Sequence, residues 1–279
     1  MSVLVLTLII LVGSYFAGLL GSLTGLGGGV VIIPLLTIGL GVNIHYAIGA
    51  SLVSVIATSS GSAAAYVKEG ITNMRIGMFL EIATTTGALI GAMLSLLIHA
   101  PVIAVIFGVI LIFSAIMSLR KKDTTVLQTE SHWAQKLKLN GSYPTADGEV
   151  VKYGIRNVGG GFVMMLFAGI ISGLLGIGSG SLKVVAMDSI MRVPFKVSTT
   201  TSNFMIGVTA AASAVVYLQR GYIDPALAMP VVIGVLLGAL TGSKILVNSN
   251  SSGWLRWVFA VIVTILAGQM IYNGLSGKI

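Results

Sequence analysis

The sequence contains almost no charge and no cysteine. Only 9% of its 279 residues are charged, whereas a soluble domain carries about 25%. Because 56% of the residues are hydrophobic, too few polar residues exist to cover a water-exposed surface, and we expect an integral membrane protein. The lack of cysteine excludes disulfides, thiolate metal sites and cysteine nucleophiles. Alternating polar and apolar strands are also missing, which argues against an outer-membrane barrel.

Histidine is scarce as well. His45, His99 and His132 lie far apart in the sequence and form no HExxH-type spacing, so we predict no metal site and no cofactor. The first basic residue is Lys68, and the N-terminus therefore lacks the basic region of a signal peptide. We expect residues 2–20 to be a retained first membrane span.

The basic residues gather in one polar stretch, residues 120–156. Seven of the sixteen Lys and Arg residues lie there, namely Arg120, Lys121, Lys122, Lys136, Lys138, Lys152 and Arg156. Under the positive-inside rule this predicts a cytoplasmic loop rather than nucleic-acid binding. Turn signals at 140–141 and 147–148, with alternating residues around them, predict a small β-hairpin in the loop. A tethering role and a regulatory role both stay open for it.

The remaining sequence divides into ten apolar segments, and the second of each five is too short to span easily. They lie near 3–22, 29–41, 46–66, 76–98, 101–119, 158–175, 181–191, 196–218, 226–247 and 254–273. A shift of 151 positions aligns the two halves without a gap. It places Gly25, Gly27 and Gly29 on Gly176, Gly178 and Gly180. It also places the motif 87–91 on 238–242, and the small residues four apart in these two motifs are spaced for close helix packing.

This self-similarity predicts an all-α membrane protein with two homologous transmembrane repeats, residues 1–119 and 157–279, separated by the loop. If all ten segments cross the membrane, the repeats are inverted, and the distribution of Lys and Arg slightly favours this arrangement. If the short segments are re-entrant, each half crosses four times.

The paired glycine motifs predict a binding site. Glycine lets the backbone leave helical geometry and approach a ligand closely. Non-helical backbone at membrane depth is tolerated where it is buried or lines a cavity, and the N–H groups that open the following half-helix attract anions. Close helix packing is the alternative, but the repetition in both halves favours a site. We therefore expect substrate contacts from Gly27, Gly28, Gly29, Gly178, Ser179 and Gly180.

Lys183 supplies the charge of the predicted site. It follows the second glycine motif by three residues, while Ile32 stands at the corresponding place in the first half. An ionisable residue at membrane depth is a functional candidate by default, and an anionic ligand would relieve the unfavourable position of a cation in the first helical turn. An ion pair with Glu81 or Asp188 is the structural alternative. Glu81 is also a candidate for proton coupling.

A polar run at 198–203 follows the short segment. Its hydroxyl and amide groups can donate hydrogen bonds to oxyanion oxygens, so we add three of its members to the expected substrate contacts: Thr200, Ser202 and Asn203. Ser202, Thr209 and Ser213 form one helical stripe, for which interhelical packing is an equal alternative. Arg192 and Lys196 flank this region and are expected to steer anions towards it.

Other function classes fit less well. A rhomboid-like intramembrane protease needs Gly-x-Ser-Gly and a helical histidine, whereas Ile177 and Gly178 precede Ser179. A presenilin-like protease needs two intramembrane aspartates, and Asp188 is a single candidate. We therefore expect no enzyme. A channel stays open, although paired repeats favour a carrier.

These motifs as a set resemble the sulfite exporter TauE/SafE family. The residues that carry the resemblance are AGLLGSLTGLGGGVVIIP at 17–34, AGIISGLLGIGSGSLKVVAMD at 168–188, PFKVSTTTSNFMIGVTAAAS at 194–213, and the loop residues 141–143 and 150–153. The resemblance implies an inner-membrane transporter that exports sulfite or organosulfonates such as sulfoacetate, driven by the proton gradient. Two departures, Ser179 in place of a glycine and the lack of a counterpart of Pro34 at Val185, are expected to alter the second short segment.

The sequence thus predicts a multi-pass secondary transporter whose partners are the lipid bilayer and a small anionic sulfur compound, with no nucleic acid. Rocking of the repeats would give alternating access. The alternative is an importer or channel for another small inorganic or carboxylate anion. Small-residue faces leave a homodimer open.

Overall fold

The computed structural model of the protein describes residues 3–24, 28–68, 71–119, 131–144, 150–248 and 252–278. The first half contains α1 (Val3–Thr24), α2 (Gly29–Pro34), the π-helical segment η1 (Leu35–Gly39), α3 (Ile44–Lys68), α4 (Met74–Ser95) and α5 (Ala100–Leu119). The second half contains α7 (Val158–Leu175), α8 (Gly180–Val185), the π-helical segment η2 (Ala186–Ile190), α9 (Phe195–Gln219), α10 (Pro225–Asn248) and α11 (Ser252–Leu275). Between the halves lie α6 (His132–Lys136), β1 (Gly141–Pro144) and β2 (Val150–Tyr153).

Five of the described helices are long and apolar enough to cross a membrane: α1, α4, α5, α7 and α9. Large apolar side chains remain exposed on them at intervals of four residues, as in α1 at Leu8, Val12 and Phe16. Water would not tolerate so much exposed apolar surface, whereas lipid covers it favourably. The length and composition of the helices therefore agree with the predicted class, an all-α multi-pass membrane protein.

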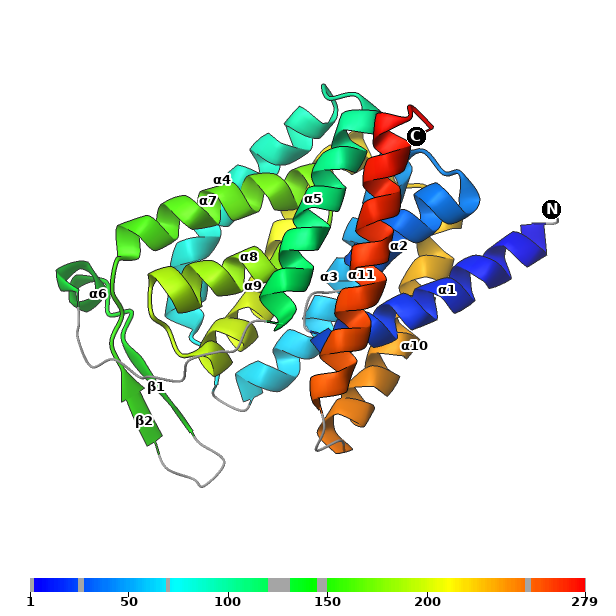
Figure 1. The fold of residues 1–279 in the computed structure, drawn as a ribbon. Helices are drawn as coiled ribbons and strands as arrows, with labels where there is room; N and C mark the ends of the chain where they lie inside the picture. Colours follow the sequence, from blue (N-terminus) through cyan, green and yellow to red (C-terminus); the bar gives the residue numbers. More distant parts are fainter. Residues whose placement is uncertain are drawn as a thin grey trace.

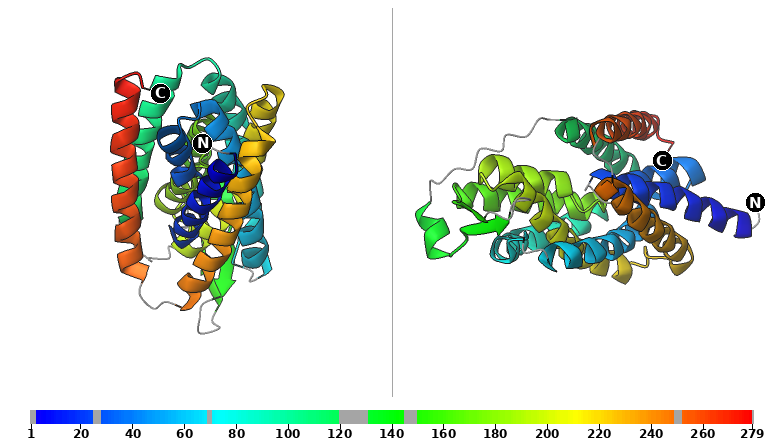
Figure 2. Two further views of the ribbon diagram at one scale, coloured as in Figure 1. Left: turned by 90° about the vertical axis from the view of Figure 1, so that its right-hand side faces the viewer. Right: turned by 90° about the horizontal axis from the view of Figure 1, so that it is seen from below.

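The long helices pack in pairs that join the two halves. α1 packs on α10, α4 on α7, α5 on α11 and α3 on α9. Figure 1 shows α4 and α7 side by side, and Figure 2 shows α5 next to α11. Glycine makes these contacts close. A Cβ atom at Gly169 of α7 would collide with the backbone of Thr84 in α4, and one at Gly18 of α1 with the backbone of Val235 in α10.

The strands β1 and β2 pair antiparallel, with Gly141 opposite Tyr153. They extend together with α6 from one end of the helical bundle, away from both termini (Figure 1). The side chain of Asn73, which caps α4, donates hydrogen bonds to the Tyr153 hydroxyl (2.8 Å) and to the carbonyl of Leu139 (3.0 Å). These bonds fix the loop region to the start of α4.

The two short helices lie inside the bundle. α2 and α8 each have six residues and continue into five residues of π-helix, η1 and η2. Pro34 ends α2, and a proline cannot donate the usual backbone hydrogen bond, which favours a wider turn. However, the same transition occurs after Val185 without any proline. The lack of a proline at Val185 therefore leaves the lengths of the helical and π-helical parts unchanged.

Candidate anion-binding site

The second glycine motif forms a tight non-helical link between α7 and α8. Gly176, Gly178 and Ser179 all have positive φ angles, +67°, +74° and +46°, so the chain turns sharply within a few residues. Two hydroxyl groups hold this link. Ser51 of α3 donates to the carbonyl oxygen of Gly176 (2.8 Å), and Ser202 of α9 donates to the carbonyl oxygen of Gly180 (3.2 Å).

The first glycine motif has a different conformation where it is described. Gly28 has φ −68°, which is ordinary helical backbone, and Gly28 and Gly29 are both buried. Gly29 lies against the hydroxyl of Ser51. The predicted contact residue Gly27 lies outside the described residues. Ser51 therefore stands between the two motifs, because it contacts Gly29 and hydrogen-bonds to Gly176.

Lys183 is completely buried in α8, with 0% of its surface exposed. Its Nζ donates a hydrogen bond to the Oγ1 of Thr209 in α9 at 2.5 Å. A buried cation needs a compensating charge or strong hydrogen bonds, because transfer from water to a low-dielectric interior is costly. In this structure a neutral hydroxyl is the hydrogen-bond partner of the ammonium group.

The compensating charge is the carboxylate of Glu81 in α4. The Thr209 hydroxyl donates to Oε1 of Glu81 at 2.7 Å, and Thr85 donates to the same oxygen at 3.0 Å. Thr209 Oγ1 also lies 2.8 Å from the carbonyl oxygen of Met205, but a carboxylate is the stronger acceptor. Three helices, α4, α8 and α9, thus meet at one chain of polar side chains, in which Lys183, Thr209 and Glu81 are buried and Thr85 is half-buried.

One carboxylate oxygen among these four polar side chains lacks a hydrogen-bond partner in the described residues. Oε2 of Glu81 is buried and has no hydrogen-bond partner among the described residues. An unsatisfied buried polar atom costs about 1–3 kcal/mol. Such atoms in native proteins call for an explanation, and a catalytic or transport role is one of them. Ser179 presents a second such atom, because its Oγ is buried without a hydrogen-bond partner in the described part of the chain.

The polar run on α9 is used mostly for structure. The hydroxyl of Thr200 donates to backbone carbonyls of its own helix, at Lys196 and Val197. Ser202 supports the glycine link, and Asn203 is half-buried. The structure therefore brings Ser202 to the glycine link and Glu81 to Lys183 through Thr209, whereas the hydroxyl of Thr200 faces its own backbone.

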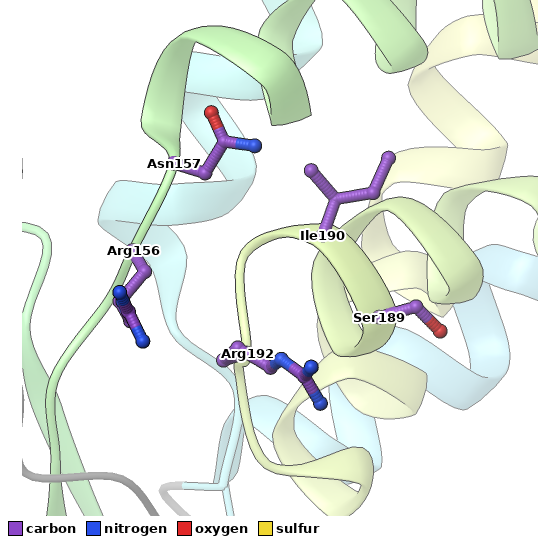
Figure 3. A pocket seen from close by; sticks show the side chains of 5 residues that line it. All are labelled: Arg156, Asn157, Ser189, Ile190 and Arg192. Atoms are coloured by element: carbon purple, nitrogen blue, oxygen red, sulfur yellow. The ribbon is translucent and has the colours of Figure 1, made fainter.

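Arg192 and Lys196 are exposed near the end of the bundle that carries the hairpin. Arg192 lines a pocket of about 490 Å³ whose other lining residues are Arg156, Asn157, Ser189 and Ile190. Figure 3 shows the two arginines at different sides of this pocket, with their guanidinium groups not pointing towards each other. The pocket therefore presents positive charge at its rim instead of a single converged anion site.

Sequence reasoning missed the roles of Thr209 and Thr85. Thr209 was noted only as part of a stripe with Ser202 and Ser213, for which packing was an equal alternative. A signal for Thr85 existed, because it follows Glu81 by four residues and such residues share a helix face. The distance of 128 residues between Glu81 and Thr209 left no local signal for their contact.

The comparisons with known proteins point to a family of membrane transporters. A family model described as "Sulfite exporter TauE/SafE" matches residues 9–270. The probable membrane transporter proteins YunE and YdhB of Bacillus subtilis (strain 168) are each 28% identical; YunE is matched over 96% of this chain and 98% of its own length, and YdhB over 85% and 89%. A probable membrane transporter protein of Methanocaldococcus jannaschii is 24% identical over 87% of this chain and 86% of its own length. No solved structure matches. The chain belongs to the TauE/SafE sulfite exporter family.

Proposed function

We propose that this membrane transporter exports small sulfur oxyanions, such as sulfite or sulfoacetate, across the inner membrane, and that Lys183 binds the anion. Membership of the family supports transport of this substrate class. The observation that carries the proposal is the fully buried ammonium group of Lys183, which has a neutral hydroxyl as its hydrogen-bond partner. A lysine near the membrane centre costs about 2.5–3.5 kcal/mol on insertion scales, so such residues persist where they serve a function.

The surroundings of Lys183 suit an oxyanion with several acceptor oxygens. Lys183 lies three residues after the glycine link, and Ser179 in that link carries a buried hydroxyl that is free to donate. The proposed set of donors to the anion also includes backbone N–H groups near Gly178 and Gly180. It is completed by three side chains, which would have to turn from their present positions: Ser202, Asn203 and Thr200. From the first half, Gly27, Gly28 and Gly29 would approach the anion through their backbone.

Alternating access is the proposed mechanism, because Lys183 has no solvent contact in this structure. An anion can reach it only after helices move apart. Paired structural repeats would allow this movement, and several observations support them. The bounds of α2, η1 and α3 reappear 151 positions later as those of α8, η2 and α9. The glycine contacts are reciprocal in the same register, since the pair Gly18–Val235 corresponds to Gly169–Thr84.

The distribution of exposed positive charge supports a cytoplasmic position for the end of the bundle that carries the hairpin. Arg156, Arg192 and Lys196 are exposed close to the hairpin, and the backbone N–H of Arg156 donates to the carbonyl oxygen of Met191. Arg75 donates to the carbonyl oxygen of Lys138 near the hairpin. Under the positive-inside rule this end faces the cytoplasm. Anions would then be concentrated at the cytoplasmic entrance, where export begins.

Flux through proteoliposomes tests the proposal. Vesicles that contain the purified full chain are loaded with sulfite, sulfoacetate, taurine or chloride, and efflux is followed for wild type, Lys183→Met and the exposed control Lys278→Met. We expect wild type and the control to release sulfite or sulfoacetate faster than taurine, which carries no net charge. Lys183→Met should reduce this flux at least tenfold. Chloride flux with no sulfur-anion flux would contradict the proposed substrate class.

A further inference from the structure

We propose that Glu81 is an internal counter-anion of Lys183, that the substrate displaces it, and that the displaced carboxylate takes up one proton. Anion binding would then be linked to protonation of the transporter. This inference rests on the proposed function, because it assumes that the substrate anion binds Lys183. It adds the identity of the proton-binding group and the sign of the coupling.

The geometry provides a site that is neutral when empty. The positive charge of Lys183 and the negative charge of Glu81 are joined by the single hydroxyl of Thr209, with hydrogen bonds of 2.5 and 2.7 Å. Because that hydroxyl accepts from the ammonium and donates to the carboxylate, it transmits the attraction between them. An anion that binds Lys183 takes the place of this link and removes the counter-charge from Glu81.

A displaced Glu81 would be a negative charge next to a second negative charge. Its hydrogen bonds both fall on Oε1, and Oε2 is buried without a partner in the described residues. Burial and a neighbouring anion both favour the neutral form of a carboxyl group. Uptake of one proton therefore restores the balance. Before binding the site holds +1 and −1, and afterwards it holds Lys183⁺, one monoanion and neutral Glu81.

The other ionisable groups around α4 are placed elsewhere. α7, which packs along α4, carries none in its sequence. α9 carries Lys196, which is exposed in its first turn, and Tyr217, whose hydroxyl donates to Ser95 at the far end of α4. On α4 itself Arg75 is exposed near the first turn. Within the described part of the chain, Lys183 is thus the charged group connected to Glu81 by hydrogen bonds.

The sign of this linkage has a consequence for transport. If the anion and the proton bind to the same state, they cross the membrane together. This differs from export driven by an inward flow of protons, which the family resemblance implies. If protons that flow inward are exchanged for anions, the proton and the anion bind alternately, so acid weakens anion binding. In the scheme proposed here acid strengthens anion binding, because protonated Glu81 no longer competes for Lys183.

Calorimetric titration of the purified full chain with methanesulfonate and sulfite separates these schemes. Methanesulfonate is the decisive probe because its charge is constant between pH 5.5 and pH 8.5. We expect its affinity in wild type to rise by up to tenfold for each unit of pH decrease. Titrations in buffers of different ionisation enthalpy should show uptake of about one proton per anion.

Glu81→Gln supplies the test at the residue. It should bind methanesulfonate at least tenfold more tightly than wild type at pH 6.5, with no proton uptake at that pH and no pH dependence between pH 5.5 and pH 6.5. Asp224→Asn, which changes an exposed carboxyl group at the start of α10, should behave as wild type. If Glu81→Gln does not fold, the proton count of wild type alone decides.

The outcomes distinguish this inference from the proposed function. Wild-type binding that depends on Lys183 but is independent of pH, or that weakens in acid, overturns the role of Glu81 and leaves the anion site intact. Retention of proton uptake by Glu81→Gln overturns it as well. If neither methanesulfonate nor sulfite binds, both the anion site and its coupling are refuted.

Discussion

The two short segments of the protein have the same backbone plan and opposite chemistry. α2–η1 and α8–η2 each consist of six helical residues followed by five π-helical residues. In α8, Lys183 connects to Thr209 and through it to Glu81. The positions 151 residues away are Ile32, which is fully buried, Thr58, whose hydroxyl donates to carbonyl oxygens of its own helix, and Val232.

The short segment does not need charge in order to fold. Ile32 fills in the first half the place that Lys183 occupies in the second, within a helix of the same length. The charged pair is therefore not required by the backbone that the two short segments share, and it lies at the second short segment, not at the first. Such an asymmetry fits one anion site between two similar halves better than two equivalent sites.

Removal of Lys183 is expected to have the largest effect on stability. Lys183→Met leaves Glu81 buried without its opposite charge, and breaking a buried pair in this way costs about 3–5 kcal/mol. Thermal unfolding of the purified protein measures the loss. The double variant Lys183→Met with Glu81→Gln removes both charges and should recover most of it, without recovering anion binding. Equal stability of wild type, single and double variants would show that the two charges do not stabilise each other.

A lysine in the first short segment should be nearly as harmful. Ile32→Lys places a cation at a fully buried position with no carboxylate at the corresponding site, and we expect a loss of about 2.5–3.5 kcal/mol. Addition of Val232→Glu should return part of this loss by rebuilding the pair. The yield of folded protein and its thermal unfolding are the measurements. An Ile32→Lys variant as stable as wild type would contradict the claim that a buried lysine in a short segment needs a carboxylate such as Glu81.

Substitution of the reciprocal glycines compares the packing of the two halves. Gly18→Ala and Gly169→Ala should each lower the free energy of unfolding by about 1–3 kcal/mol, because the added methyl groups meet the backbones of Val235 and Thr84. Gly159→Ala is the matched control, since a Cβ atom there meets nothing within 4 Å. Chemical denaturation measures all three. Clearly unequal losses at Gly18 and Gly169 would weaken the case for two equivalent repeats.

The smallest expected effect concerns the second glycine motif. Ser179 adopts the left-handed conformation, which disfavours any residue with a Cβ atom by about 1–2 kcal/mol. Ser179→Gly should therefore stabilise the protein by about 1 kcal/mol. Ser181→Gly, inside α8, should destabilise it by about 1–2 kcal/mol, because glycine weakens the helix and the buried hydrogen bond between the Ser181 and Ser114 hydroxyls (3.0 Å) is lost. A shift of the unfolding midpoint in opposite directions is the predicted result. If Ser179→Gly is less stable than wild type, the buried hydroxyl makes a contact that outweighs the strain.

The helices could be predicted from the sequence because hydropathy and glycine position are local signals. The segment expected at 158–175 is the observed α7, and both short segments were expected from their length. The π-helical turns could not be foreseen, since one follows Pro34 and the other follows Val185. The difference between Ser179 and Gly28 was expected only as an unspecified alteration of the second short segment.

The candidate site was predictable in part. Lys183 stood out because a charge in an apolar repeat has no structural need, and Glu81 was identified as a partner or a coupling group. Their connection through Thr209 was not predicted, because it depends on how α4 and α9 are rotated against each other. Membrane helices are apolar on most faces, so the sequence carries little information about that rotation.

Anomalous X-ray scattering from bound selenite would locate the anion most directly. Selenite has the pyramidal shape and the charge type of sulfite, and the native protein contains no other selenium. A selenium peak within about 4 Å of Nζ of Lys183, together with movement of the Glu81 carboxylate away from Thr209, is the predicted result. A peak between Arg156 and Arg192, with the chain from Lys183 to Glu81 unchanged, would contradict the assignment of the anion site to α8.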